Sequence, residues 1–149
     1  MITGQFDVTM DEKGRLMVPA KLRSEINGNT IFVTQGYEDG NLWLFTPDEW
    51  AVFSNKVMSN MSPFSEEDRE LYRDIISPAQ ELEIDRMRRI LIPPSLKAYA
   101  KLKKEALILG VIKFIELWDA ETYALHKKES KERGVSKENQ KRLKERIFF

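Results

Sequence analysis

Residues 8–23 read V-T-M-D-E-K-G-R-L-M-V-P-A-K-L-R, and residues 82–97 read L-E-I-D-R-M-R-R-I-L-I-P-P-S-L-K. The two stretches align without a gap, and the positions that lie between the identical residues are apolar in both where the pattern predicts strands. The identical positions are Asp11 with Asp85, Arg15 with Arg89, Pro19 with Pro93, and Leu22 with Leu96. An internal repeat of this kind predicts two copies of one supersecondary unit.

Each copy reads as strand, charged turn, strand and helix. In the first copy, alternating apolar residues predict a half-buried strand from Phe6 to Met10, and residues 16–18 predict a buried strand. Pro19 opens a helix over residues 20–26, which Asn27-Gly28 ends. Two more strands follow, over residues 30–34 and 42–46, linked by a turn at Gly36 and Asp39-Gly40.

The second copy repeats this order. Strands are expected over residues 81–84, 90–92, 106–109 and 113–118, with a helix from Pro93-Pro94 to about residue 102. Each copy then ends in an acidic helix start, P-D-E-W at 47–50 and D-A-E-T-Y at 119–123, which the helix dipole favours. We therefore divide the chain into a first half (1–54), a helical connector (55–78), a second half (79–126) and a basic tail (127–149).

Two segments lie outside the repeat. In the connector, Ser65 is an N-cap residue followed by three carboxylates, a pattern that predicts the start of a helix. Past His126 the chain holds 9 basic and 4 acidic residues. This tail is either a solvated helix or partly disordered until it meets a partner.

Composition excludes several classes of protein. The chain has no cysteine, so disulfides and thiolate metal sites are excluded and a reducing compartment is favoured. No apolar run reaches the roughly eighteen residues of a membrane span, and the opening residues lack a signal-peptide pattern. We therefore expect a cytoplasmic protein without a membrane partner.

The charge is distributed unevenly although its sum is zero. Residues 1–75 hold 7 basic and 13 acidic residues, and the remainder holds 17 and 11. Opposite fields on two parts of one subunit favour head-to-tail self-association.

The repeated Asp-x-x-x-Arg turn has two readings. The structural one is a carboxylate that accepts backbone amide hydrogens and pairs with an arginine; an exposed pair contributes only about 0–1 kcal/mol. In the functional one, the same carboxylate orients the guanidinium for phosphate or for the O6/N7 edge of guanine. Additional cations gather at both turns, namely Lys13 in the first and Arg86, Arg88 and Arg89 in the second.

These motifs resemble those of a known protein family. The doubled D-x-x-x-R with its downstream proline, and the endings L-W-L-F-T-P-D-E-W and F-I-E-L-W-D-A-E-T-Y, closely resemble the MraZ family of bacterial transcriptional regulators. The resemblance covers roughly residues 1–125 and leaves the tail outside.

The resemblance implies an α+β fold, a pseudo-twofold swapped-hairpin (AbrB-like) β-barrel built from two repeats with flanking helices. It implies ring-shaped homo-oligomers that bind tandem G-containing boxes in double-stranded DNA upstream of the division and cell-wall gene cluster, their own operon, and hence a place on the nucleoid. A neighbouring rRNA methyltransferase is a further implied partner. DNA contacts carry over to Lys13 and Arg15 and, in the second copy, to Arg86, Arg88 and Arg89, with Asp11 and Asp85 orienting the arginines.

The second turn departs from the pattern. It has Arg88 where the first has Gly14. A left-handed conformation costs arginine more than glycine, which raises the alternative that the second turn has a different shape.

Two rival classes remain. For an enzyme, Asp11, Asp85, Glu12 and Glu83 are the available carboxylates, but no nucleophile, metal-ligand spacing or phosphate loop accompanies them. His126 is expected to be solvated, so we predict no catalytic activity, metal or cofactor. The other rival is a protein-interaction module that uses aromatic residues, which at strand and helix spacing are expected to be mostly core: Trp43, Phe45, Trp50, Phe114 and Trp118.

Overall fold

The structure is a computed structural model that describes residues 1–37 and 40–147. The first half contains β1 (Gln5–Thr9), β2 (Arg15–Met17), α1 (Ala20–Arg23), β3 (Thr30–Gln35), β4 (Leu42–Phe45) and α2 (Pro47–Asn60). After α3 (Glu66–Leu71) and the π-helix η1 (Tyr72–Ile76), the second half contains β5 (Gln80–Glu83), β6 (Arg89–Leu91), α4 (Pro94–Tyr99), β7 (Glu105–Gly110), β8 (Ile115–Asp119) and α5 (Ala120–Glu132), and α6 (Val135–Ile147) follows. Asp39, in the expected turn, lies outside the described residues.

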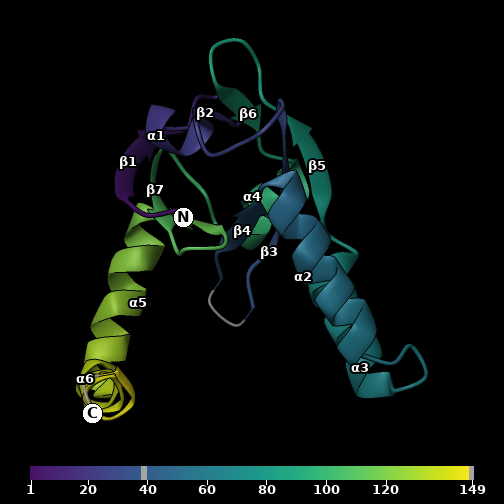
Figure 1. Cartoon of the computed structure of the whole chain (residues 1–149). Coiled ribbons are helices and arrows are strands. Elements are labelled where there is room, and N and C mark those ends of the chain that lie inside the picture. Colours follow the sequence, from purple (N-terminus) through teal and green to yellow (C-terminus); the bar gives the residue numbers. More distant parts are fainter. Residues whose placement is uncertain (38–39, 148–149) are drawn as a thin grey trace.

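The strands form two hydrogen-bonded groups. Six of them make an antiparallel sheet in the order β1-β7-β8-β4-β3-β5, and β2 pairs with β6 in a separate two-stranded ribbon. The ribbon lies over one side of the sheet (Figure 1). The order is symmetric about the β4–β8 pair, as expected from two copies of one unit.

The first strand of each copy pairs with the other copy. Gln5 of β1 lies opposite Leu109 of β7, and Thr30 of β3 lies opposite Glu83 of β5. The ribbon likewise takes one strand from each copy. This exchange confirms the expected α+β swapped-hairpin fold with two internal repeats.

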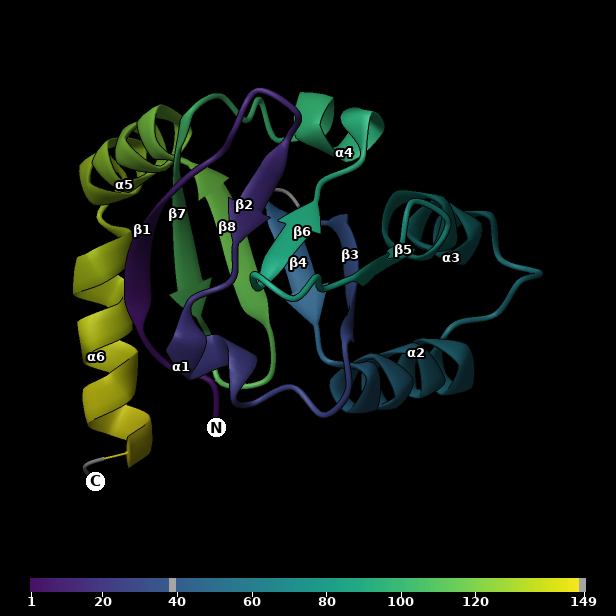
Figure 2. The same cartoon turned by 90° about the horizontal axis from the view of Figure 1, so that it is seen from above.

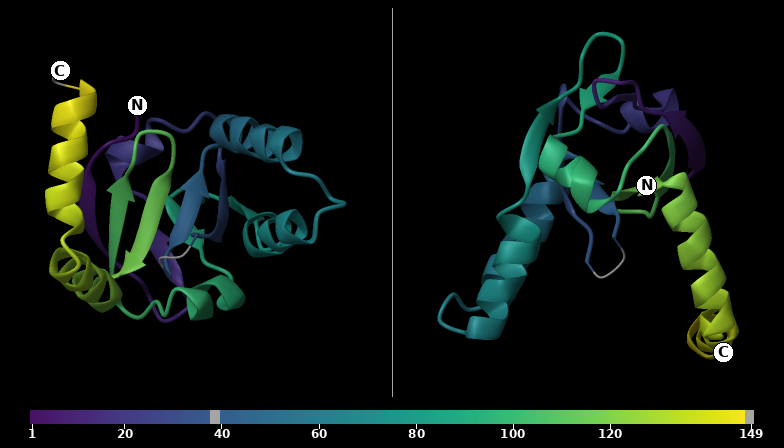
Figure 3. Two further views of the ribbon diagram at one scale, coloured as in Figure 1. Left: turned by 90° about the horizontal axis from the view of Figure 1, so that it is seen from below. Right: turned by 180° about the vertical axis from the view of Figure 1, so that it is seen from behind.

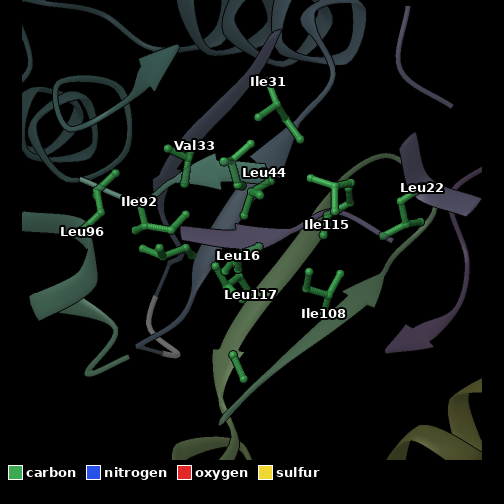
Figure 4. Close-up of a cluster of buried hydrophobic side chains, with 14 of the residues drawn as sticks. Leu16, Leu22, Ile31, Val33, Leu44, Ile92, Leu96, Ile108, Ile115 and Leu117 are labelled. Carbon is green, nitrogen blue, oxygen red and sulfur yellow. The ribbon is translucent and has the colours of Figure 1, made fainter. Parts of the chain in front are cut away.

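The core lies between the ribbon and the sheet. Leu16 and Ile90, which are partners at the middle of the ribbon, are each 1 % exposed. Leu16 lies next to buried residues of the central strands, such as Leu117 of β8 (Figure 4), and Ile90 belongs to the same core cluster. Full burial of such a side chain contributes about 1.5–3 kcal/mol, so this contact holds the ribbon on the sheet.

The two short helices end earlier than the sequence predicts. The expected helix over residues 20–26 ends at Arg23, because the next amides donate three residues back, Ile26 N–H to Arg23 O (3.2 Å). The expected helix to residue 102 ends at Tyr99, since Lys101 has a φ of 53°, which no α-helix continues.

The connector is helical, as expected, but it is interrupted. Ser65 caps α3 by accepting from the N–H of Asp68 (3.3 Å). The π-helix η1 follows, with Ser77 N–H donating to Tyr72 O (2.8 Å). Thr34 is fully buried in β3 and donates its hydroxyl to Ile75 O, so this turn of the connector is anchored to the sheet. The division at residues 54, 78 and 126 stays a prediction.

Two helical arms project from the side of the sheet away from the ribbon. The first is α2 with α3, and the second is α5 with α6 (Figures 1 and 3). Thr46 and Asp119 cap α2 and α5 at matching places in the two copies, as the acidic helix starts predicted. The tail is helical over α6, with its side chains exposed over residues 136–147.

Candidate nucleic-acid interface

The first charged turn is built around Asp11. Its Oδ1 accepts hydrogen bonds from the backbone N–H groups of Lys13 and Arg15, both at 2.9 Å, and its Oδ2 accepts one from Nε of Arg15, also at 2.9 Å. Gly14 closes the turn by donating its N–H to Asp11 O (3.0 Å), with a φ of 86°. One carboxylate thus fixes both the turn and the arginine.

The second turn repeats this arrangement around Asp85. Its Oδ1 accepts from the N–H groups of Met87 (2.9 Å) and Arg89 (2.8 Å), and its Oδ2 accepts from Nε of Arg89 (2.8 Å). Arg88 takes the place of Gly14 and adopts a φ of 61°. The two turns therefore have the same hydrogen-bonded shape, and the alternative of a different second turn is wrong: the carboxylate network holds the arginine in the left-handed region.

Both carboxylates are held in the charged form. The pKa of Asp11 is lowered chiefly by the hydrogen bond from the Arg15 backbone amide, and that of Asp85 by the one from the Arg89 amide. The arginine side chains themselves strengthen the effect in each turn. Opposite charges and hydrogen bonds to the ionised form favour that form.

Each arginine keeps donors to offer. Of the three guanidinium nitrogens of each arginine, the carboxylate accepts a hydrogen bond from Nε alone among the described contacts. Within residues 1–37 and 40–147, the terminal nitrogens of Arg15 and Arg89 have no hydrogen-bond acceptor. About a third of each side chain is exposed, 32 % and 31 %. Each guanidinium is thus oriented on one edge and open on another, which suits bidentate recognition.

The ribbon places the two turns at its opposite ends (Figure 2). Each turn is tied to the strand of the other copy, because Gly14 O accepts from Ile92 N–H (3.0 Å) and Arg88 O accepts from Val18 N–H (2.7 Å). A surface hollow brings Arg15 of the first copy together with Arg86 and Arg89 of the second. The arginines of both copies therefore belong to one surface.

The remaining cations differ in what they contact. Lys13 and Arg86 are exposed. Arg88 is half-buried, and its Nη2 lies 3.4 Å from Sδ of Met17 on the neighbouring strand. The side chain of Arg88 therefore lies along the ribbon, against Met17, instead of pointing into solvent as Lys13 and Arg86 do.

Sequence reasoning missed two apolar residues on this surface. Met17 and Leu91 are exposed and lie on the same face of the ribbon as Arg15 and Arg89. The signal that could have found them is the two-residue alternation with the buried Leu16 and Ile90.

Of the carboxylates considered for catalysis, Glu83 lines one hollow with Asp85 and Glu12 lines another with Asp11, but the two copies do not bring their carboxylates together. Asp11 and Asp85 lie at opposite ends of the ribbon, each occupied by its own arginine. Among the described residues, no group of three acidic, histidine or cysteine side chains is arranged to hold a metal ion. His126 is not simply solvated, since it packs against the Trp118 ring with centroids 4.8 Å apart.

The aromatic residues are largely packed, as expected. Phe45 and Trp118 are buried. The half-buried Trp43, Trp50 and Phe114 cluster with Phe45 between α2 and the sheet, with ring centroids 4.9–5.4 Å apart.

Over the residues described, none of the helices has both the length and the apolar character that crossing a membrane requires.

The fold and the turns together define a class: a two-repeat α+β protein with exchanged hairpins, which presents paired Asp–Arg turns on a basic ribbon. The family described as "MraZ protein, putative antitoxin-like" matches the chain twice, over residues 1–74 and 75–146, so the chain belongs to the MraZ family. The second match runs past residue 125, where the resemblance ended, and takes in most of the tail.

Relatives are similar over most of their length. The transcriptional regulator MraZ of Treponema denticola is 45% identical over 130 residues, which cover 87% of this chain and 89% of the relative. That of Treponema pallidum is 41% identical over 128 residues, 86% of this chain and 85% of the relative. That of Mesoplasma florum is 35% identical over 130 residues, 87% of this chain and 88% of the relative.

Proposed function

We propose that this protein is a sequence-specific DNA-binding transcriptional regulator that binds through its two Asp–Arg turns. The observation that supports this most strongly is the repeated geometry: in both copies an ionised carboxylate orients a guanidinium whose terminal donors are open. Folding alone needs no such surplus of open cationic donors on one ribbon. The relatives named transcriptional regulators agree with this function.

The residues have different roles in this proposal. Arg15 and Arg89 read guanine in the major groove, where a bidentate arginine contact is the commonest specific one. Lys13 and Arg86 contact phosphates, which set register and affinity without reading sequence. Arg88 supports the ribbon through Met17 and contacts phosphate more weakly.

We further propose that several subunits form a ring and occupy tandem G-containing boxes upstream of the division and cell-wall genes, including the protein's own gene. One small ribbon offers few base contacts, so linked subunits are needed for tight binding. The helical arms support self-association, because residues 47–76 hold 7 acidic and 3 basic residues whereas residues 120–147 hold 5 and 9. Opposite charges on arms that project from the same side suit head-to-tail contact. The protein is then expected on the nucleoid in the cytoplasm.

A DNA titration at two salt concentrations tests the roles. We expect Arg15→Ala to weaken binding to the upstream region by about 1–3 kcal/mol per engaged site and to relax base preference. Lys13→Ala should weaken binding to upstream and scrambled DNA alike and reduce the salt slope by about 1. If the two variants behave identically on both DNAs, the assigned roles are wrong.

A second candidate is a protein-interaction module, for example one that binds the rRNA methyltransferase encoded nearby. The observation that favours it is an apolar hollow of about 230 Å³ on the far side from the turns, lined by Trp43, Phe45, Phe53 and Phe114 with Lys56 and Lys113 at its edge. Exposed aromatic hollows are typical of interaction sites. Methyltransferase binding that survives Arg15→Ala and is lost in Phe114→Ala, together with the absence of specific DNA binding, would favour this candidate.

A further inference from the structure

We propose that Leu91 and Met17 contact the C5-methyl groups of thymines next to the guanines read by Arg15 and Arg89. This inference rests on the proposed DNA binding and adds to it the apolar half of the reading surface. It predicts that the preferred DNA sequence contains thymine at fixed steps from guanine.

The starting observation is the outer face of the ribbon. Leu16 and Ile90 point into the core, so the alternate residues of β2 and β6 point outward. Leu91 is 53% exposed and lies directly opposite Arg15, and Met17 is 43% exposed and lies opposite Arg89. Each arginine thus has an apolar neighbour supplied by the other copy.

An exposed leucine or methionine alone would need no explanation. Here both copies place one beside an oriented arginine, and neither is needed for the core. The hollows beside Leu91 are lined by cations (Lys13, Arg15, Arg86 and Arg89) and by carboxylates (Glu81, Glu83 and Asp85). A partner that only matched these charges would leave the apolar side chains unused.

DNA supplies a matching group. The major groove admits a two-stranded ribbon, and the thymine methyl is the apolar group among its base edges. Directly opposed side chains on an antiparallel pair are about 5 Å apart, whereas successive base pairs are about 3.4 Å apart. When Arg15 reaches a guanine, Leu91 therefore lies one to two base-pair steps away.

The two apolar residues are not equivalent. Leu91 lies beside Gly14, where a Cβ would come within 3.9 Å of its Cδ1, so the absence of a side chain leaves the leucine open. Met17 shares its surroundings with the guanidinium of Arg88. We therefore expect the larger effect at Leu91.

The test removes only the methyl group from the DNA. A preferred duplex is selected from a random pool with the full-length protein, and each thymine is then replaced by uracil. At a contacted step, uracil should weaken wild-type binding about fourfold, the value of one buried methyl-sized group. At the step that Leu91 contacts, Leu91→Ala should bind the thymine and uracil duplexes equally, whereas Leu91→Met should keep the discrimination. At the step that Met17 contacts, Leu91→Ala should still discriminate.

Leu125→Ala is the matched control, because Leu125 is 57% exposed on α5, in the arm that points away from the ribbon. It should discriminate like the wild type. The inference is overturned by any of three results: no uracil position affects specific binding, Leu91→Ala weakens binding to the thymine and uracil duplexes by the same factor at every uracil position, or the selected sequence has no thymine within two steps of a required guanine. Selection of no preferred sequence would instead contradict the proposed function as well.

Discussion

Replacing Asp11 by asparagine separates orientation of Arg15 from simple charge. Asparagine keeps the shape and an oxygen for the backbone amides of Lys13 and Arg15, but it places an NH₂ group or a neutral oxygen where Oδ2 now accepts from Nε of Arg15. The guanidinium is then no longer held.

Asp11→Asn should change the affinity in opposite directions on specific and on scrambled DNA. Ordering a long side chain on binding costs about 0.5–1.5 kcal/mol, so specific affinity should fall about 2- to 12-fold per engaged site. Binding to scrambled DNA should become slightly tighter, because the variant removes a negative charge near the phosphates.

Fluorescence anisotropy with specific and scrambled duplexes, at one salt concentration, measures both affinities. Glu12→Gln is the control, since Glu12 is exposed in the same turn and its side chain makes no hydrogen bond or ion pair with the rest of the described chain. It should tighten binding to both DNAs. If Asp11→Asn behaves like Glu12→Gln, then Asp11 acts only as a charge and the orienting role is refuted.

Three further predictions concern the fold. The pKa values of Asp11 and Asp85 lie below the ordinary 3.8, so the stabilisation by these ionised carboxylates is complete above pH 3.8 and is lost as pH falls through the folded-state pKa. In denaturant titrations, the free energy of unfolding of the Asp11→Asn/Asp85→Asn variant should therefore depend less on pH below about pH 4 than that of the wild type. Parallel pH profiles for the variant and the wild type would contradict this. Leu16→Ala should lower the free energy of unfolding by about 2–5 kcal/mol in urea titrations, whereas a loss below 1 kcal/mol would mean that the ribbon is not anchored by its core face. Asp119→Ala should lower the free energy of unfolding more than Thr46→Ala, by about 2 against about 1 kcal/mol in urea titrations. Asp119 accepts from the N–H groups of both Lys103 and Thr122, whereas among the described residues the Thr46 side chain accepts from the N–H of Glu49 alone. Equal losses would refute the comparison.

The sequence predicted most of the elements because each has a strong local signal. The paired turns followed from Asp11, Arg15 and their repeats, and the helix starts followed from Pro47 and Asp119. The exchange of β1 and β5 between copies came from the family resemblance, since strand alternation does not specify which strand lies alongside.

What the sequence did not predict depends on tertiary contacts. The π-helix η1 could not be predicted from nearby residues, because one of its contacts is tertiary: the carbonyl of Ile75 accepts from the hydroxyl of Thr34, which is 41 residues away. The left-handed Arg88 goes against its own conformational preference and is held by the Asp85 network. A role in DNA contact for Met17 and Leu91 could be proposed only from the strand register, which places them opposite Arg89 and Arg15.

The exchanged strands also set the order in which the chain can fold during its synthesis. β1 finds its hydrogen-bonding partner only when β7 has been made, about a hundred residues later. At about 5–20 residues per second, this strand waits about 5–20 s with an unpaired edge. The nascent first half is therefore the stage at which the protein is most exposed to misassociation and to chaperones, and synonymous codon changes that slow translation between residues 10 and 105 should lower the yield of folded protein.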